Sequence, residues 1–367
     1  MESSTVEKKP RYLTEVDLLK FIAIAGMVII HIYENWTGTS EVSPYPTTAV
    51  DVFIQFLGGP VCAPLFMLAC GIGVIYTRSN RPIDYLNRGL ILLVTAYILS
   101  FLRSYVAAAA EGLSNDQLLL ELLNVDILHL AGLAFILIGI LRALRCNRWH
   151  VLILAIAMFA ISNLVGIVPV DGLTGYVVGL FFFTQCGDVC FPLFEWFIYI
   201  AVGVFLGSYL RGSTDHPRMY KGLFVLGLLM FVIVTIESLV TGFDLRDFFT
   251  LYANRFYQQS FLALAWILGI VFMCMSAAYF ALSAHPRPRF DSLCHFFGKN
   301  LNRIYIMQWI IVGNVSAVIA YSGVTIAPIL AIPLGILLLA GVSLLVPTYI
   351  KGVEFLRSRV SENTGSF

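Results

Sequence analysis

The sequence predicts an all-α protein, embedded in a membrane as a bundle of about ten transmembrane helices. Hydrophobic residues make up 59% of the 367 positions and charged residues only 12%. Soluble domains are roughly 45–50% apolar and about 25% charged. The apolar residues also gather in stretches of about 20, which is the length that a helix needs to cross the hydrocarbon core of a bilayer. A mean hydropathy of +0.85 agrees with this fold class.

The predicted spans follow one another along nearly the whole chain, and no tract between them resembles a soluble domain. Residues 1–14 are expected to form a cytoplasmic N-terminal segment, residues 15–350 the transmembrane domain and residues 351–367 a cytoplasmic tail. The expected spans are residues 15–35, 52–76, 86–108, 127–144, 150–168, 190–210, 220–241, 256–282, 300–321 and 325–349.

The basic residues alternate along the chain and predict its orientation. Of the 23 Lys and Arg residues, 18 fall at junctions on one side of the membrane. By the positive-inside rule this side is cytoplasmic, and both termini lie there. The other side holds only Arg103, Arg246 and Arg255, while Lys20 and Arg303 fall within spans. Because the basic residues are spread over many junctions, they indicate topology in a lipid bilayer and disfavour nucleic acid as a partner.

The first span carries ionisable side chains, which are expensive at membrane depth and mark function by default. Lys20 and His31 are eleven residues apart, so they project from one helix face about 16 Å apart along the axis. Asp17, three residues before Lys20, and Glu34, three residues after His31, extend this stripe. The first span therefore presents a polar track across the membrane.

Each of these side chains has a structural and a functional interpretation. Lys20 could pair with Asp17 or reach toward the membrane surface. His31 could pack as a neutral side chain against a backbone carbonyl. An imidazole with an ordinary pKa of about 6.5 can also take a proton from an attacking hydroxyl or amine. Glu34 could orient that ring or lie solvated at the helix end. The candidate catalytic residues are His31, Lys20 and Glu34.

Further polar residues collect toward the outer half of the bundle. Trp36 ends the first span, His129 opens the fourth, Glu195 lies early in the sixth and Glu237 late in the seventh. These four residues are candidates for substrate binding. The structural alternatives are interhelical hydrogen bonds and placement at the membrane interface.

A second polar group lies on the cytoplasmic side. The stretch FFGKNLNRIYIMQW (296–309) is expected to place Lys299, Asn300 and Arg303 at a helix N-terminus, which favours anions. These residues, together with Arg78 and Arg88, are candidates for cofactor binding. The alternative is a topology signal combined with helix caps. No spacing of Cys and His residues suggests a metal site.

Four stretches resemble known membrane acyltransferases. DLLKFIAIAGMVIIH (17–31) resembles the opening signature of the acyltransferase-3 family, a basic residue followed after ten positions by His. Three others are similar to the related branch of heparan-α-glucosaminide N-acetyltransferase and its bacterial homologues: DILHLAGLAFILIGIL (126–141), FPLFEWFIYIAVGVFLG (191–207) and FGKNLNRIYIMQWI (297–310). The stretches occur in the order, span number and orientation of that family.

The resemblance implies an enzyme that takes an acyl group, expected to be acetyl, from cytoplasmic acetyl-CoA. It would deliver this group to a hydroxyl or amine of a glycan at the outer face. It further implies that His31 is catalytic and that Lys20 is required. The phosphates of coenzyme A would meet Lys299, Arg303, Arg78 or Arg88. The expected location is the inner membrane of a bacterium, and small residues on several spans permit a homodimer.

The chain departs from the family pattern at a few positions. Lys20 stands where Arg is more usual, Phe21 where Gly commonly follows, and Gln308 at a position often held by His. Residues 36–51 contain no His, although the lysosomal enzyme has its essential His in that loop. Two alternatives stay open, a proton-coupled transporter or exporter, which also needs a polar track, and an inactive scaffold that would tolerate substitutions in the stripe.

Overall fold

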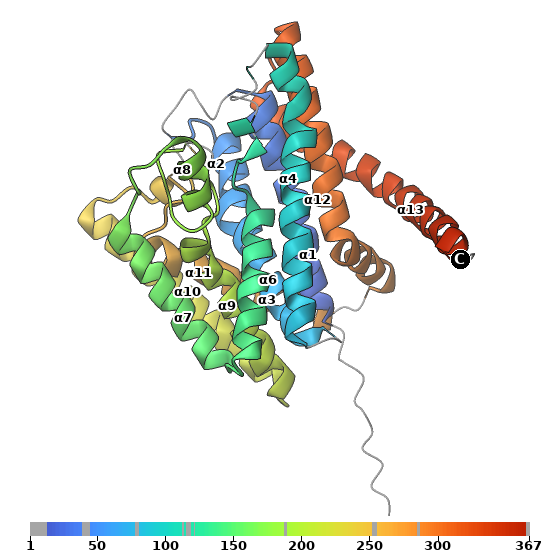
Figure 1. The fold of residues 1–367 in the computed structure, drawn as a ribbon. Coiled ribbons are helices and arrows are strands. Elements are labelled where there is room, and N and C mark those ends of the chain that lie inside the picture. The colour runs from blue at the N-terminus through green and yellow to red at the C-terminus, as the bar shows by residue number, and fades with distance from the viewer. Residues whose placement is uncertain are drawn as a thin grey trace, which may run out of the picture.

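The computed structural model describes residues 13–38, 45–77, 81–111, 114, 119–120, 122–186, 189–251, 255–284 and 287–364. These residues form a helical bundle (Figure 1), and the only β pairing among them is two isolated bridges. The helices are α1 (Thr14–Trp36), α2 (Ala49–Phe56), α3 (Ala63–Tyr76), α4 (Pro82–Glu111), α6 (Ile127–Ala143), α7 (Arg148–Val165), α8 (Gly172–Gly179), α9 (Leu193–Gly212), α10 (His216–Thr241), α11 (Phe261–Ala284), α12 (Pro288–Ser322) and α13 (Ala331–Thr364), with 3₁₀ turns at Leu245–Phe248 and Pro328–Leu330.

The helices confirm the predicted fold class of an all-α membrane bundle. Nine of the described helical segments are long and apolar enough to cross a membrane, with α2 and α3 counted as one continuous segment, Ala49–Tyr76. The remaining predicted span, the fourth (127–144), corresponds to α6, which is apolar but has only 17 residues. α13 continues through residues 351–364, so most of the predicted tail is helical.

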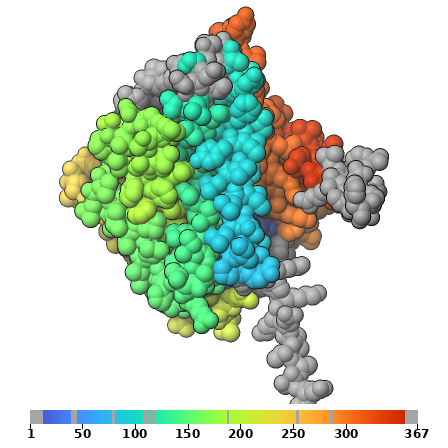
Figure 2. Space-filling view, in the orientation of Figure 1, coloured from blue at the N-terminus to red at the C-terminus, as the bar shows by residue number. Residues whose placement is uncertain are grey.

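The bundle has a buried centre and an apolar exterior. Most of α1, the Ala49–Tyr76 segment, α9 and α11 is buried, whereas α4, α7, α10 and α13 are mostly exposed. Figure 2 shows one exterior face, on which α4 (cyan) lies beside the green helices. Large apolar side chains are exposed on these outer helices, among them Ile91 and Val94 on α4 and Ile153 on α7. An exterior of this kind matches lipid, and the polar chemistry lies inside it.

The second span is interrupted by a π-helical segment, Leu57–Cys62, which contains Pro60. Proline removes a backbone donor from the helix, and the π turn accommodates that loss. Two glycines let α1 lie directly against this segment. A Cβ on Gly58 would stand 2.5 Å from Ile30, and one on Gly26 would overlap Cys62. The second span is therefore irregular and packs closely against α1.

The start of α12 corrects one prediction. The helix begins at Pro288 rather than near residue 300, with proline in its first turn and Asp291 nearby. Lys299, Asn300 and Arg303 therefore lie in the body of the helix, and the prediction that they form its anion-favouring N-terminus was wrong. Residues 288–299 are too polar to be recognised as part of an apolar span, so hydropathy does not reveal this first part of the helix.

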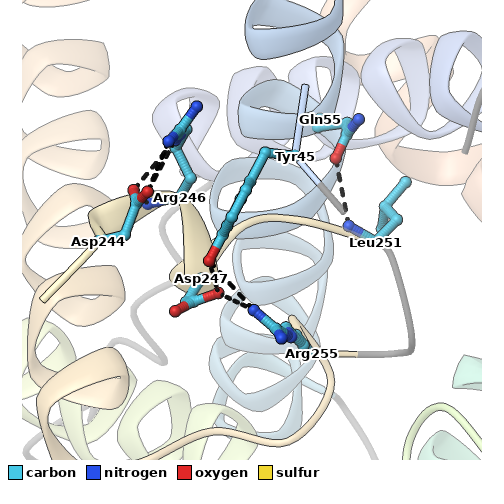
Figure 3. Close-up of polar contacts among 7 residues, drawn as sticks. All are labelled: Tyr45, Gln55, Asp244, Arg246, Asp247, Leu251 and Arg255. Carbon is cyan, nitrogen blue, oxygen red and sulfur yellow. Dashed lines mark hydrogen bonds and ion pairs between the residues drawn. The ribbon is translucent and has the colours of Figure 1, made fainter. Parts of the chain in front are cut away.

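Loops on the predicted outer side are joined by aromatic and charged contacts (Figure 3). The Arg246 guanidinium lies over the Tyr45 ring, 4.4 Å from its centroid, and Tyr45 Oη donates to Asp247 Oδ1 at 3.1 Å. Asp247 also pairs with Arg255. Hydrogen bonding from Arg246 lowers the pKa of the neighbouring Asp244 carboxyl. These contacts connect the segment after α10 to the segment before α2.

A buried hydrogen-bond chain connects the same loops to α1. Gln55 Oε1 accepts from the backbone N–H of Leu251 at 3.2 Å, and Gln55 Nε2 donates to Tyr33 Oη at 3.3 Å. Tyr33 Oη in turn donates to Asp51 Oδ1 at 3.1 Å. The outer end of α1 is thus fixed next to the residues that form the candidate site.

Candidate active site

His31 lies in the outer half of α1 and packs against α12. Its Nδ1 is 3.2 Å from Gln308 Oε1 and 3.0 Å from Gln308 Nε2, so it meets the side-chain amide. The imidazole stacks on Trp309 with a centroid distance of 3.9 Å and meets Tyr305 edge-on at 6.1 Å. Gln308 and Tyr305 are buried. Three neighbouring side chains of α12 therefore fix the position of this half-buried ring.

The two ring nitrogens of His31 have different surroundings. Nδ1 is engaged by Gln308, whereas no hydrogen bond to Nε2 occurs within the part of the chain that the structure describes. When the amide oxygen of Gln308 accepts the Nδ1 proton, the lone pair of the neutral ring lies on Nε2. That is the tautomer a general base requires.

A charged group lies against the same indole ring. The Arg103 guanidinium carbon is 4.7 Å from the Trp309 centroid, and Arg103 Nη1 is 3.7 Å from Asp126 Oδ2. Asp126 caps α6 by accepting from the Leu128 N–H at 2.9 Å, and its own backbone N–H meets His129 Nδ1 at 3.2 Å. We refer to this set as the outer polar centre: His31, Arg103, Asp126, His129 and Gln308.

Asp126 is ionised within this centre. Burial alone would raise the pKa of its carboxyl, but the hydrogen bond with His129 and the positive charge of Arg103 outweigh burial and bring that pKa below its ordinary value. The His129 side chain is fully buried, and its Nε2 has no hydrogen-bond partner within the described residues. Buried polar atoms usually have partners, so His129 retains hydrogen-bonding capacity for a ligand.

Lys20 lies toward the other end of α1. Its Nζ is 3.2 Å from Asp17 Oδ1, which confirms the predicted ion pair, and the second oxygen of Asp17 is 3.0 Å from His295 Nδ1 on α12. A Cβ on Gly298 would overlap the Asp17 carboxylate, so the glycine lets α12 approach it. We refer to Asp17, Lys20 and His295 as the inner polar cluster.

The other two candidates on α1 lie near its outer end. Glu34 is half-buried and makes no hydrogen bond to His31 in the described structure, where Gln308 orients the ring instead. Trp36 Nε1 donates to the Val312 carbonyl at 3.0 Å and ties α1 to α12. Trp36 therefore has a structural contact beside its predicted role in substrate binding.

The two predicted glutamates lie on other helices. Glu195 on α9 is buried, accepts from Ser162 Oγ on α7 at 2.8 Å and accepts from the backbone N–H of Gln259. This geometry matches the interhelical alternative. Glu237 lies on α10, which packs against α11, and its Oε2 is buried with no hydrogen-bond partner among the described residues. Neither glutamate joins the outer polar centre.

The predicted cofactor-binding residues are only partly brought together. Arg303 Nη1 donates to Asn300 Oδ1 at 2.6 Å, and Lys299 is exposed on the same helix. Arg88 on α4 donates to Thr77 Oγ1 at 3.2 Å. Arg78 lies outside the described residues. Within those residues, no group of three or more His, Cys, Asp or Glu side chains is placed to hold a metal ion.

Sequence reasoning missed several members of the outer polar centre. Arg103 lies inside the predicted span 86–108, and a charge at that depth indicates function. The sequence prediction used Arg103 only as one of the basic residues that indicate topology. Asp126 directly precedes a span and resembles an ordinary helix cap. Gln308 was noted only as a departure from a family pattern. None of these signals places the residues beside His31.

Comparison with known families bears on the open interpretations. The catalytic family of heparan-alpha-glucosaminide N-acetyltransferase matches residues 11–235, more than half of the chain. The chain belongs to this family. No curated protein and no solved structure matches the chain. The resemblance to acyltransferase-3 stays a prediction.

The family match covers the part of the chain from α1 into α10. It includes His31, Arg103, Asp126 and His129, and it ends before α12. The residues of α12 that hold His31 thus lie beyond the matched region. In this member of the heparan-α-glucosaminide N-acetyltransferase family, the candidate site combines the matched region with a helix outside it.

Proposed function

We propose that the protein is a membrane acetyltransferase with His31 as its general base. The acetyl group would pass from acetyl-CoA at the cytoplasmic face to a hydroxyl or amine of a glycan at the outer face. Family membership supports the reaction class, and the distribution of basic residues supports the orientation. The observation that supports the role of His31 is the environment of its ring: Gln308 holds Nδ1, which leaves Nε2 available to accept a proton.

The proposed reaction is a direct transfer in a ternary complex. His31 Nε2 accepts the proton of the acceptor while the acceptor oxygen or nitrogen attacks the thioester carbonyl. Gln308 and Trp309 keep the ring in place during this step. As the carbon–sulfur bond breaks, the imidazolium returns the proton to the leaving thiolate. General-base catalysis of this kind contributes roughly 10²–10⁴ in rate.

The remaining predicted residues have proposed places around this reaction. Lys20, Arg78, Arg88, Lys299, Asn300 and Arg303 would act on the donor side, because they lie at or near the helix ends predicted to face the cytoplasm. Glu34, Trp36 and His129 lie at or near the outer ends of their helices and would contact the acceptor. Glu195 and Glu237 are the weakest candidates, since the structure places them outside the outer polar centre. The inner membrane of a bacterium is the proposed location.

The test is acetyl transfer by the purified chain in lipid nanodiscs. Radiolabelled acetyl-CoA serves as donor, with glucosamine and glucose as probe acceptors and release of free acetate as a separate readout. Wild-type protein should acetylate at least one probe, and His31→Ala should reduce the rate by roughly 10²–10⁴. His295→Ala, which removes the imidazole of the inner polar cluster, is the matched control and should remain active. Full activity of His31→Ala would refute the mechanism.

A proton-coupled carrier is the second candidate function from the sequence. Family membership favours the enzyme, and no contact among the described residues specifically favours a carrier. Exchange of a labelled sugar across sealed vesicles without any requirement for acetyl-CoA would support the carrier instead.

A further inference from the structure

A cavity of about 390 Å³ lies between α3, α6, α7 and α9. These four helices are neighbours in the bundle (Figure 1). The cavity is lined by the ends of the helices that the positive-inside rule places toward the cytoplasm. Its walls combine apolar side chains with three arginines, one each from the end of α6, the start of α7 and the end of α9: Arg142, Arg148 and Arg211. We refer to this cavity as the basic pocket.

The charges of the basic pocket are not neutralised by the residues that line it, because none of them is acidic. Arg211 Nη1 donates to the Ile75 carbonyl at 3.0 Å, at the last turn of α3. The Arg148 guanidinium lies 5.6 Å from the centroid of Phe205. Arg142 makes no ion pair within the described residues. Within the described residues, Arg211 is therefore held by a carbonyl and Arg148 by an aromatic ring, and Arg142 has no charged partner.

The lining indicates the chemistry of a ligand. Guanidinium groups match phosphate oxygens in geometry as well as charge. Asn147 and Ser208 add polar groups beside them, whereas Val74, Ile138 and Val204 provide an apolar wall. Pockets that hold small molecules have volumes of about 300–1,000 Å³. A ligand that satisfies both walls carries a phosphate group next to an apolar or extended organic part.

We propose that the basic pocket binds the phosphate of an amphiphilic phosphate ester through Arg142, Arg148 and Arg211. Two sources share this chemistry, the nucleotide end of the acetyl-CoA donor and the headgroup of an anionic phospholipid. The first source rests on the proposed function, and the second does not. The pocket is separate from the bases predicted on α12, because α12 packs against α1, α4 and α13 rather than against α7 or α9.

Topology alone does not account for the basic pocket. The positive-inside rule explains why arginines occur at these helix ends. It does not require three of them to surround one cavity without an acid. Arg145, on the same connection between α6 and α7, is exposed and does not line the cavity. It is therefore the matched control, because it has the same residue type and loop but lies outside the pocket.

The experiment measures two ligands on the full-length protein. Binding of coenzyme A is measured by calorimetry in phosphatidylcholine nanodiscs, with 3′-dephospho-coenzyme A and pantetheine as probes that lack one or all phosphates. Retention of phosphatidylglycerol is measured by native mass spectrometry in detergent. The variants are Arg142→Gln, Arg148→Gln and Arg145→Gln, with Arg142→Lys as a charge-preserving variant.

The nucleotide source predicts that Arg142→Gln and Arg148→Gln weaken coenzyme A binding about tenfold or more. Arg145→Gln should change it less than twofold. The lipid source predicts that the same two pocket variants lose bound phosphatidylglycerol. If both ligands bind wild-type protein and pocket variants equally, the pocket proposal is overturned while the proposed function stands. If coenzyme A fails to bind wild-type protein but phosphatidylglycerol depends on the arginines, the proposed function fails and the pocket stands.

A second measurement needs no variant. Cys146 lines the basic pocket and is half-buried. Coenzyme A or phosphatidylglycerol should slow its alkylation by N-ethylmaleimide at least threefold, as read by peptide mass spectrometry, whereas pantetheine and phosphatidylcholine should not. Equal alkylation rates with and without all four probes would contradict the proposal even if the arginine variants do not fold.

Discussion

The two ends of α1 each present a polar group to α12, and the two groups are built differently. At the inner polar cluster, Asp17 lies between Lys20 and His295, and both carboxylate oxygens have a partner. At the outer polar centre, His31 meets a neutral amide and an indole, and its Nε2 makes no hydrogen bond among the described residues. The first arrangement combines an ion pair within α1 with a hydrogen bond that joins α1 to α12. The second keeps a base available inside an apolar bundle, as catalysis requires.

The largest effect is expected from His31→Ala. Transfer should fall by roughly 10²–10⁴, because His31 is the base that Gln308 and Trp309 hold in position to take the proton of the acceptor. The melting temperature should change little, since the ring is only half-buried. His295→Ala at the inner polar cluster should retain most activity. Equal losses in both variants would show that the two ends of α1 do not differ in function.

Arg103→Gln should destabilise the fold by about 3 kcal/mol, because it leaves the buried Asp126 carboxylate without its ion pair. The side chains of this pair are only 13% and 10% exposed. The control is Arg246→Gln, which breaks the exposed pair with Asp244 and should leave the melting temperature nearly unchanged. Thermal unfolding in nanodiscs measures both. Similar shifts for the two variants would contradict the buried role of Arg103.

Acid should weaken the outer polar centre by a smaller amount. The folded-state pKa of the Asp126 carboxyl lies below its ordinary value. Its carboxylate therefore stabilises the fold at neutral pH, and this contribution is lost as the pH falls below about 4. Asp126→Asn should remove this part of the pH dependence of the melting temperature. An unchanged dependence in that variant would assign the acid sensitivity to other carboxylates.

Gln308→Leu should reduce kcat about fivefold with little change in KM, because one hydrogen bond that orients His31 is worth about 1 kcal/mol. Gln308→Glu should restore the rate at high pH. Its carboxylate favours the imidazolium, so the acid limb of the rate profile should move to higher pH. An unshifted profile in Gln308→Glu would mean that Gln308 acts only in packing.

Lys20→Met should have the smallest effect. Lys20 is partly exposed and Asp17 keeps His295 as a partner, so loss of the ion pair should change stability less than Arg103→Gln does. If Lys20 acts on the donor, KM for acetyl-CoA should rise a few-fold while kcat changes less, and Lys20→Arg should be close to wild type. A loss of kcat as large as that of His31→Ala would place Lys20 at the chemical step.

The fold class and the Lys20–Asp17 pair of the inner polar cluster were predictable from the sequence, whereas the contact of His295 with Asp17, which joins two helices, was not. Span length follows from the thickness of the bilayer, and the pairing of Lys20 with Asp17 follows from their spacing on one helix face. The start of α12 was not predictable from hydropathy, because residues 288–299 form a polar helix that extends beyond the apolar span. Local rules therefore succeeded where contacts lie within one helix.

The outer polar centre and the basic pocket depend on contacts between distant segments. Gln308 follows His31 by 277 positions, and only the packing of α12 on α1 brings them together. Arg142, Arg148 and Arg211 each carry the same topology signal in the sequence, and their convergence requires the packing of α6, α7 and α9. The missed residues are thus those whose roles are set by tertiary contacts.

The most direct test of the account is sided acetyl transfer in sealed proteoliposomes that contain uniformly oriented protein. Labelled acetyl-CoA is supplied only at the face that carries the termini, and glucosamine only at the opposite face. The account predicts labelled N- or O-acetyl glucosamine on the side opposite the donor, and its loss in His31→Ala but not in His295→Ala. Product confined to the donor side, or equal transfer by His31→Ala, would contradict transmembrane transfer through the outer polar centre.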